Sequence, residues 1–257
     1  MDEKMNQILG FVRELMAALG AREIEPANTA SEELMNAARI DMESWERDFP
    51  EVPNPAGEGM IALRTILMPS MLVALGGCRM GEMEAVRAFE IGNTYTKNYV
   101  IPTKEPFKSW NLSVGAYGET ESLENMRATM RAFLLNMGIS EIEFVPESEY
   151  GTYAPDKCER IVTKDPSGLE VELGIMGQFH PEVVENFFIG CDAFGAELFL
   201  DLVVSLVASA NQEIQEPEDA APSIDAAILS EEAAQLDELE RQVKALFGTA
   251  SFDNDLN

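Results

Sequence analysis

Apolar residues recur every three to four positions in several long stretches of the chain, which predicts amphipathic helices. The first such stretch is 3–19, and Gly20 follows it where a left-handed cap ends a helix. A second helix is expected from the capping residue Ser31 to about Phe49, because prolines come directly after it. Further helices are predicted from Pro69 to Gly76-Gly77, from 121 to 137, from Pro181 to Phe187 and from Leu202 onward.

β-strands are predicted between these helices, and alternation of apolar and polar residues indicates two of them, 85–95 and 109–117. The expected strands are 21–25, 85–95, 109–117, 142–145, 160–163, 169–176 and 193–200. The two segments 160–163 and 169–176 flank Asp165-Pro166-Ser167-Gly168, whose composition is typical of a hairpin turn.

Two of these strands alternate clearly. In 85–95, Val86, Ala88 and either Glu90 or Tyr95 are offset from Phe89 and Ile91. In 109–117, Asn111 and Ser113 alternate with the apolar Trp110, Leu112 and Val114. This pattern fits an antiparallel sheet with one face packed and the other facing either a cleft or solvent. In a cleft, Asn111 and Ser113 would line a small-ligand pocket. The alternative is a plain solvent-exposed face.

Two groups of motifs resemble one known protein family. The first group surrounds Arg64 and Glu90, and the second surrounds His180 and Glu197. In family order they read Asn54-Pro55, Leu63-Arg64-Thr65-x-Leu67-x-Pro69, Phe89-Glu90-Ile91-Gly92, Gly177-Gln178-Phe179-His180-Pro181-Glu182-Val183 and Ala193-Phe194-Gly195-Ala196-Glu197-Leu198. Over roughly 50–205 the chain is similar to the class II aminoacyl-tRNA synthetase core, and in particular to the module in the phenylalanyl-tRNA synthetase beta subunit. A fainter similarity extends to the pyrrolysyl-tRNA synthetase catalytic domain.

The resemblance implies an α+β fold, with a mostly antiparallel sheet flanked by helices. We expect three parts: a core domain over 1–210, an acidic linker over 211–229, and a C-terminal helix with a disordered end over 230–257. The linker follows from its composition, which is rich in acidic residues and proline. The helix would begin at Ser230 and end near Gly248.

The resemblance also indicates where chemistry is expected and where this chain departs from it. Class II synthetases stabilise the charge that develops on the ATP α-phosphate with fixed cations. Thr96 stands where one family arginine follows its strand, and Leu200-Asp201-Leu202-Val203 contains no arginine where the second is expected. Lys97 lies nearby but offers a point charge rather than a planar fork. We therefore predict no catalytic residue, and ATP and Mg²⁺ would enter only if the family activity is retained.

Five residues are the candidates for a site. Asn111, Ser113, Glu90 and Glu197 are candidate pocket residues, and no metal-ligand cluster is predicted. Arg64 lies in an apolar run and must be paired if it is buried, with Glu90 or Glu197 as partner. His180, the single histidine, is expected to make a structural hydrogen bond at a helix start.

The charge of the chain restricts the partners that we expect it to bind. The chain has 46 acidic and 18 basic residues and a net charge of −28. This charge repels phosphate backbones, so tRNA is expected to be contacted only indirectly. Adaptation to a salty cytoplasm explains the same charge equally well. The absence of a long apolar run, of a signal-peptide pattern and of paired cysteines predicts a cytoplasmic protein away from membranes.

Three functions stay open at this point. The first is a phenylalanyl-tRNA synthetase beta-like protein that acts through assembly, with a catalytic alpha-like chain or as a homodimer. The second is a stand-alone paralogue that binds an amino acid or a related small ligand. The third is an active ligase that uses other cations. The helix–turn–strand at 3–25 resembles the class II motif that builds the subunit interface, although an ordinary core helix has the same pattern.

Overall fold

A computed structural model describes residues 2–54, 60–99 and 105–213. The predicted helix from Ser230 and most of the predicted acidic linker therefore lie outside the described residues. Within the described residues, no helix is both long enough and apolar enough to cross a membrane.

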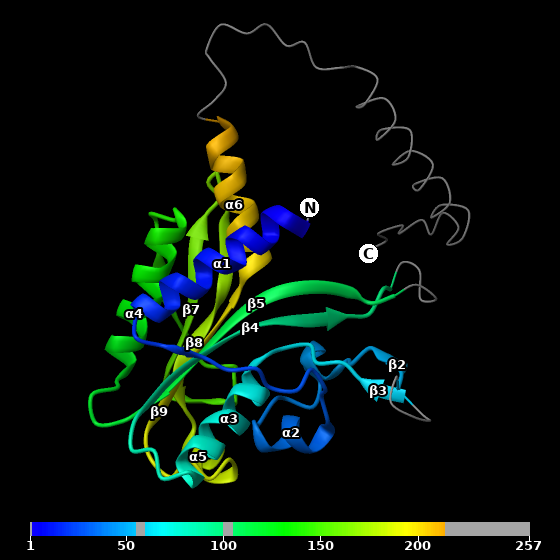
Figure 1. The fold of residues 1–257 in the computed structure, drawn as a ribbon, viewed down its shortest axis with the longest axis vertical. Helices are drawn as coiled ribbons and strands as arrows, with labels where there is room; N and C mark the ends of the chain where they lie inside the picture. The colour runs from blue at the N-terminus through cyan, green and yellow to red at the C-terminus, as the bar shows by residue number, and fades with distance from the viewer. Residues whose placement is uncertain (1, 55–59, 100–104, 214–257) are drawn as a thin grey trace, which may run out of the picture. The chain divides into compact units, whose positions relative to one another are not determined.

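A seven-stranded sheet forms the centre of the molecule, in the order β1-β4-β5-β9-β8-β7-β6 (Figure 1). Only β1 and β4 pair in parallel, and every other neighbouring pair is antiparallel. The strands are β1 (Arg22–Glu23), β4 (Val86–Thr96), β5 (Phe107–Tyr117), β6 (Glu143–Glu147), β7 (Tyr153–Lys164), β8 (Glu170–Phe179) and β9 (Ala193–Phe199). The predicted α+β class with a mostly antiparallel sheet is confirmed.

Helices cover both faces of this sheet. On one face lie α1 (Asp2–Ala18), α4 (Leu123–Met137) and α6 (Leu200–Glu213). On the other lie α2 (Glu32–Ala37), α3 (Met68–Met80) and α5 (Pro181–Asn186). Each layer of helices buries its own apolar cluster against the sheet. Side chains alternate along the strands between the two clusters, as predicted, and Phe89, Leu112 and Val114 face the first layer. A small separate hairpin, β2 (Glu51–Pro53) with β3 (Met60–Ala62), follows the short 3₁₀ helix η1 (Trp45–Arg47).

The predicted helix from Ser31 to Phe49 is wrong in length. It ends at Ala37, because Arg39 adopts the left-handed conformation with φ of 58°. The amide of Ile40 donates to the Met35 carbonyl at 3.0 Å and that of Arg39 donates to the Asn36 carbonyl at 3.0 Å, the pattern of a Schellman cap. The sequence hides this stop because arginine, not glycine, occupies the left-handed position. The freed segment 40–46 then folds over the sheet.

Gly76 and Gly77 do not end α3, which continues to Met80. A Cβ placed on Gly76 would lie 2.0 Å from the carbonyl oxygen of Phe187. This glycine therefore permits a close backbone approach to the end of α5 rather than a turn.

A row of glycines sets how closely the second helical layer approaches the sheet. Gly115, Gly195 and Gly177 are paired across β5, β9 and β8. A Cβ on Gly115 would lie 2.7 Å from the Cγ of Met71 in α3, and one on Gly195 would lie 2.3 Å from the Phe179 ring. The absence of these side chains lets α3 pack directly on the sheet beside the candidate site.

Candidate functional site

Three of the predicted site residues form one row across the sheet. The register pairs Glu90 of β4 with Ser113 of β5, and Ser113 with Glu197 of β9. Asn111 lies two residues along β5, on the same face. Asn111 and Ser113 are 2% and 0% exposed, so the alternative of a solvent-exposed face is wrong. This polar row is buried under the layer that contains α3.

Arg64 pairs with Glu90 within this layer. Its Nη2 lies 2.5 Å from Oε1 of Glu90, and both side chains are buried. The guanidinium also donates to the Asn93 carbonyl at 3.1 Å, to the Ala27 carbonyl at 3.3 Å and to Ser70 Oγ at 3.4 Å. Gly92 leaves the room for this arrangement, since a Cβ there would lie 2.4 Å from the guanidinium. Arg64 thus ties the start of α3 to β4.

Glu197 occupies the N-terminus of α3 with its carboxylate. The amides of Leu67 and Met68 donate to it at 2.9–3.0 Å, and Asn111 Nδ2 donates at 2.9 Å. A helix N-terminus attracts anions because its first amides have no partner within the helix. Here the protein's own carboxylate takes that position, from a residue 130 places away in the sequence.

The buried carboxylates outnumber the buried cation. Burial raises the pKa of Glu90 to about 7 although Arg64 opposes the shift, and burial also raises the pKa of Glu197 against its hydrogen bonds. Glu46 of η1, 8% exposed, has its pKa raised to about 7, again mainly by burial. Arg47, whose side chain is 7% exposed, opposes the shift at Glu46 but is paired with Glu32. Glu46, Glu90 and Glu197 therefore leave this region with excess negative charge when all three are ionised.

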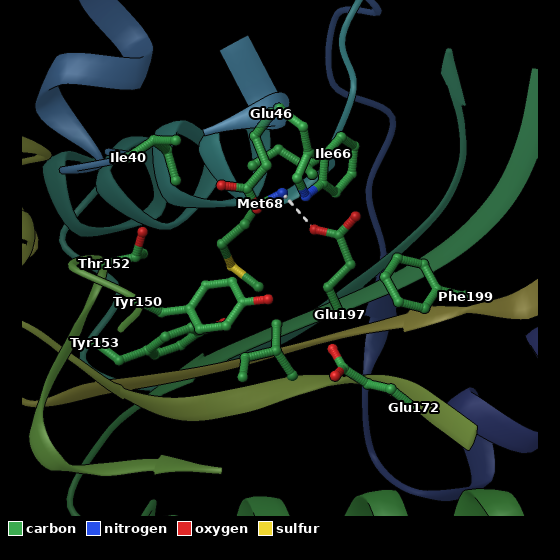
Figure 2. Close-up of a pocket in the computed structure, with 12 residues that line it drawn as sticks. Ile40, Glu46, Ile66, Met68, Tyr150, Thr152, Tyr153, Glu172, Glu197 and Phe199 are labelled. Carbon is green, nitrogen blue, oxygen red and sulfur yellow. Dashed lines mark hydrogen bonds between the residues drawn. The ribbon is translucent and has the colours of Figure 1, made fainter. Parts of the chain in front are cut away.

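A small cavity of about 40 Å³, the inner cavity, opens beside this polar layer (Figure 2). Glu197 and Met68 line it from the sheet and from α3, Glu46 lines it from η1, and Tyr150 and Tyr153 reach in from the start of β7. Of the predicted pocket residues only Glu197 lines it. Glu90, Asn111 and Ser113 are buried and do not line the cavity.

A wider cavity of about 450 Å³, the outer cavity, adjoins the inner one. The two share the lining residues Ile40, Trp45, Glu46, Tyr150 and Thr152. The segments 40–46 and 149–153 build most of both cavities, and sequence reasoning missed them. The first was predicted as helix, and nothing local to the sequence shows that these two distant loops meet.

Other residues occupy the positions at which the resemblance leads us to expect phosphate-binding arginines. Thr96 ends β4 opposite Phe107 at the exposed end of the strand pair. Lys97 is engaged in an ion pair with Asp48. Asp201, in the first turn of α6, accepts a hydrogen bond from the Trp110 amide at 2.8 Å. Among the described residues, no lysine, arginine or histidine lines either cavity, so these residues do not fit the phosphates of ATP.

His180 caps α5 and lies apart from both cavities. Its Nδ1 accepts from the Glu182 amide at 3.2 Å, and Arg39 lies 3.0 Å from the same ring. Within residues 2–54, 60–99 and 105–213, no group of three or more histidine, cysteine, aspartate or glutamate side chains is arranged to hold a metal ion.

Residues 2–200 match the family model described as the phenylalanyl tRNA synthetase beta chain CLM domain. The chain belongs to this family. All of the candidate residues, from Glu46 to Glu197, lie inside the matched range of the CLM domain.

Curated relatives from bacteria and archaea carry the same subunit name. The chain is 25% identical to the phenylalanine–tRNA ligase beta subunit of Clostridium acetobutylicum over 250 residues, which is 96% of this chain and 30% of that protein. It is 27% identical to the beta subunit of Clostridium tetani, over 75% of this chain and 23% of that protein, and 28% identical to that of Pyrococcus abyssi, over 74% and 32%. The chain thus spans between about a quarter and a third of the length of these relatives.

Proposed function

We propose that this chain acts as a beta-subunit-like component of phenylalanine–tRNA ligation, working through assembly with a catalytic alpha-like chain and not activating an amino acid itself. Its membership of the CLM domain family supports the link to this reaction. Its similarity to proteins named beta subunits supports a role within a multi-chain enzyme in the cytoplasm.

The negative charge of the two cavities supports the proposal that this chain does not itself activate an amino acid. Attack of an amino acid on the ATP α-phosphate needs fixed cations near the reacting atoms. Both cavities are lined by acids and by no basic residue of the described chain. The N-terminus of α3, which points at this region, already holds the Glu197 carboxylate. A triphosphate would meet repulsion here instead of stabilisation.

The N-terminal helix is the surface that we propose for assembly. The helix α1 and the strand β1 cover the stretch that resembles the class II motif that builds the subunit interface. The strand β1 lies at the edge of the sheet, where it pairs with β4. Phe11 of α1 is 47% exposed, while Leu9, Val12 and Met16 of the same helix are buried in the core. A partner chain would cover the outer side of α1. With a net charge of −28, the chain would contact tRNA only through such a partner.

Two measurements on one preparation test this proposal. The chain is co-expressed with the tagged alpha-like synthetase chain of its own organism, and the purified material is assayed for phenylalanine-dependent ATP–pyrophosphate exchange. We expect a stable complex of the two chains and no exchange by this chain alone. Exchange by the isolated chain would overturn the non-catalytic assignment. A monomer or a homodimer with no bound alpha-like chain would overturn the assembly.

A matched pair of variants locates the surface. Phe11→Asp should weaken the complex at least tenfold, because it places a charge in the covered apolar contact. Leu135→Asp, at a 50% exposed apolar position of α4, is the control and should leave the complex intact. Equal loss in the two variants, or no loss in either, would show that α1 does not form the interface.

A further inference from the structure

The two adjoining cavities combine a strong negative charge with very little compensation. Six carboxylates line them: Asp41, Glu43, Glu46, Glu149, Glu172 and Glu197. In the described part of the chain, only Glu172 has an ion pair, with Arg160 Nη1 at 3.4 Å. Asp41, Glu43 and Glu149 lie at the outer cavity, while Glu172 and Glu197 lie at the inner one. Glu46 lines both.

A buried hydroxyl without a partner marks the inner cavity as a place for a polar group. Tyr153 lines this cavity and is only 4% exposed, yet its hydroxyl oxygen has no hydrogen-bond partner. Figure 2 shows Tyr150 and Tyr153 extending from the same side of the cavity toward Glu197. An unpaired buried hydroxyl costs about 1–3 kcal/mol, which a ligand donor would recover. Burial raises the pKa of Tyr153 well above its ordinary value, so this hydroxyl stays neutral and can accept an N–H.

The shape of the cavities sets the size of the group. A volume of about 40 Å³ is a few times the roughly 10–15 Å³ that a single water molecule needs on this measure, so the inner cavity admits a small polar group. The outer cavity of about 450 Å³ has room for an extended chain, and Trp45 and Tyr150 offer ring surfaces that favour methylene groups and cations.

We propose that these cavities bind an aliphatic diamine or polyamine, with one ammonium group in the inner cavity and a second at the acidic rim of the outer one. Glu46, Glu197 and the Tyr153 hydroxyl surround the inner ammonium. The methylene chain runs past Trp45 and Tyr150, and the second ammonium lies near Asp41, Glu43 and Glu149.

The same lining excludes a free amino acid. An α-carboxylate would lie beside the carboxylates of the cavity, with no basic residue of the described chain to meet it. This site therefore differs from the amino-acid pocket that the synthetase resemblance implies. Its test does not depend on the outcome of the assembly experiment described above.

Binding should depend on pH through Glu46. Its carboxyl is raised to a pKa of about 7 by burial and by Glu197, against Arg47 and the Ser44 hydroxyl. An aliphatic ammonium keeps its proton up to a pH of about 10. A bound ammonium favours the ionised carboxylate, so binding releases a proton and is several-fold weaker at about pH 6 than at about pH 8.

Calorimetric titration of the whole chain with 1,4-diaminobutane tests the proposal. A chain with a net charge of −28 attracts any cation, so the titration is repeated at about 0.15 M and about 0.5 M NaCl. We expect saturable binding of one diamine at both salt concentrations. n-Butylamine, with one charge, should bind more weakly, and 4-aminobutanoate and phenylalanine should not bind. Equal binding of 4-aminobutanoate, or no saturable binding of the diamine, would overturn the proposal.

Substitutions inside and outside the cavities distinguish binding at this site from the general attraction of cations to an acidic protein. Glu46→Gln should weaken diamine binding about tenfold or more, and Tyr153→Phe should weaken it about fivefold through one lost hydrogen bond. Glu84→Gln removes an exposed charge outside the cavities and is the control, with unchanged affinity expected. Circular dichroism establishes that each variant is folded. An equal effect of Glu46→Gln and Glu84→Gln, each of which removes one negative charge, would assign the binding to net charge. Tighter binding of a lysine-containing peptide than of the diamine would assign the site to a protein partner.

Discussion

At the scale of single residues, Glu197 of β9 links the start of α3 to β5. Its carboxylate accepts from two backbone amides at the start of α3 and from Asn111 on the neighbouring strand. It also lines the inner cavity. One acid thus fixes the helix on the sheet and fills the position where an outside anion would bind. The pairing of Arg64 with Glu90 secures the same helix start from β4.

Glu46 gives a prediction about stability and pH. Burial raises its pKa from about 4.5 to about 7 in the folded protein. Below about pH 4.5 the carboxyl is protonated in both states. Between about pH 4.5 and pH 7 the unfolded chain loses this proton while the folded chain keeps it, so stability falls as pH rises, by about 1.4 kcal/mol per pH unit. Above about pH 7 the difference levels off.

Urea unfolding of the wild type and of Glu46→Gln at about pH 5, 6, 7 and 8 measures this contribution. The variant lacks the titrating group, so the wild type should lose stability relative to it over this range. The other acids of the chain are common to both proteins and cancel in the difference. Parallel pH profiles would show that the folded pKa of Glu46 is not raised.

At the scale of elements, the contact between α3 and the sheet depends on glycines in the strands, which have no side chain to hold the helix away. In the row Gly115, Gly195 and Gly177, the missing side chains leave room for Met71 of α3, for the Phe179 ring and for the Tyr153 ring, respectively. Because α3 begins at the hydrogen bonds of Glu197, its depth on the sheet also sets the position of Met68 in the inner cavity.

Gly195→Ala tests this packing. Its Cβ would lie 2.3 Å from the buried Phe179 ring, so we expect a loss of about 1–3 kcal/mol of unfolding free energy. Gly10→Ala in α1 is the matched control: nothing lies within 4 Å of its Cβ, and helix propensity predicts a gain of about 0.5–1 kcal/mol. Chemical unfolding of both variants is the measurement. A neutral Gly195→Ala would mean that the ring moves aside without cost.

At the scale of the whole molecule, charge dominates. A net of −28 on 257 residues repels itself in the compact state more than in the unfolded chain. The two cavities account for only six of the 46 acidic residues. Most of the charge is therefore a property of the surface and of the stretch after α6, and it acts on folding and on partners at long range.

Salt should therefore stabilise this protein. Raising NaCl from about 0.05 M to about 1 M shortens the Debye length to about 3 Å and screens the repulsion. We expect the midpoint of thermal unfolding to rise by several degrees, and KCl to have the same effect. Sucrose at matched osmolality is the control for effects that do not involve charge. A midpoint that falls or stays constant with salt would show that self-repulsion does not limit stability.

The sequence by itself determined the local structure and the face on which each strand residue lies. Alternation along 85–95 put either Glu90 or Tyr95 on the face away from Phe89, and alternation along 109–117 put Asn111 and Ser113 on the face away from Leu112, because side-chain direction in a strand has a period of two. Helical periodicity likewise located α1, α4 and α5 to within a few residues. The motifs at Arg64, Glu90, His180 and Glu197 were enough to indicate the family.

Only the tertiary structure decided which of these residues meet. The register that aligns Glu90, Ser113 and Glu197 depends on the pairing of β5 with β9, in which Ser113 meets Glu197 from 84 positions away, and no local pattern encodes it. The early stop of α2 at Arg39 releases the segment 40–46, and its meeting with Tyr150 and Tyr153 creates the cavities. Burial in that place, rather than residue type, gives Glu46 its raised pKa, and burial exists only once the chain has folded.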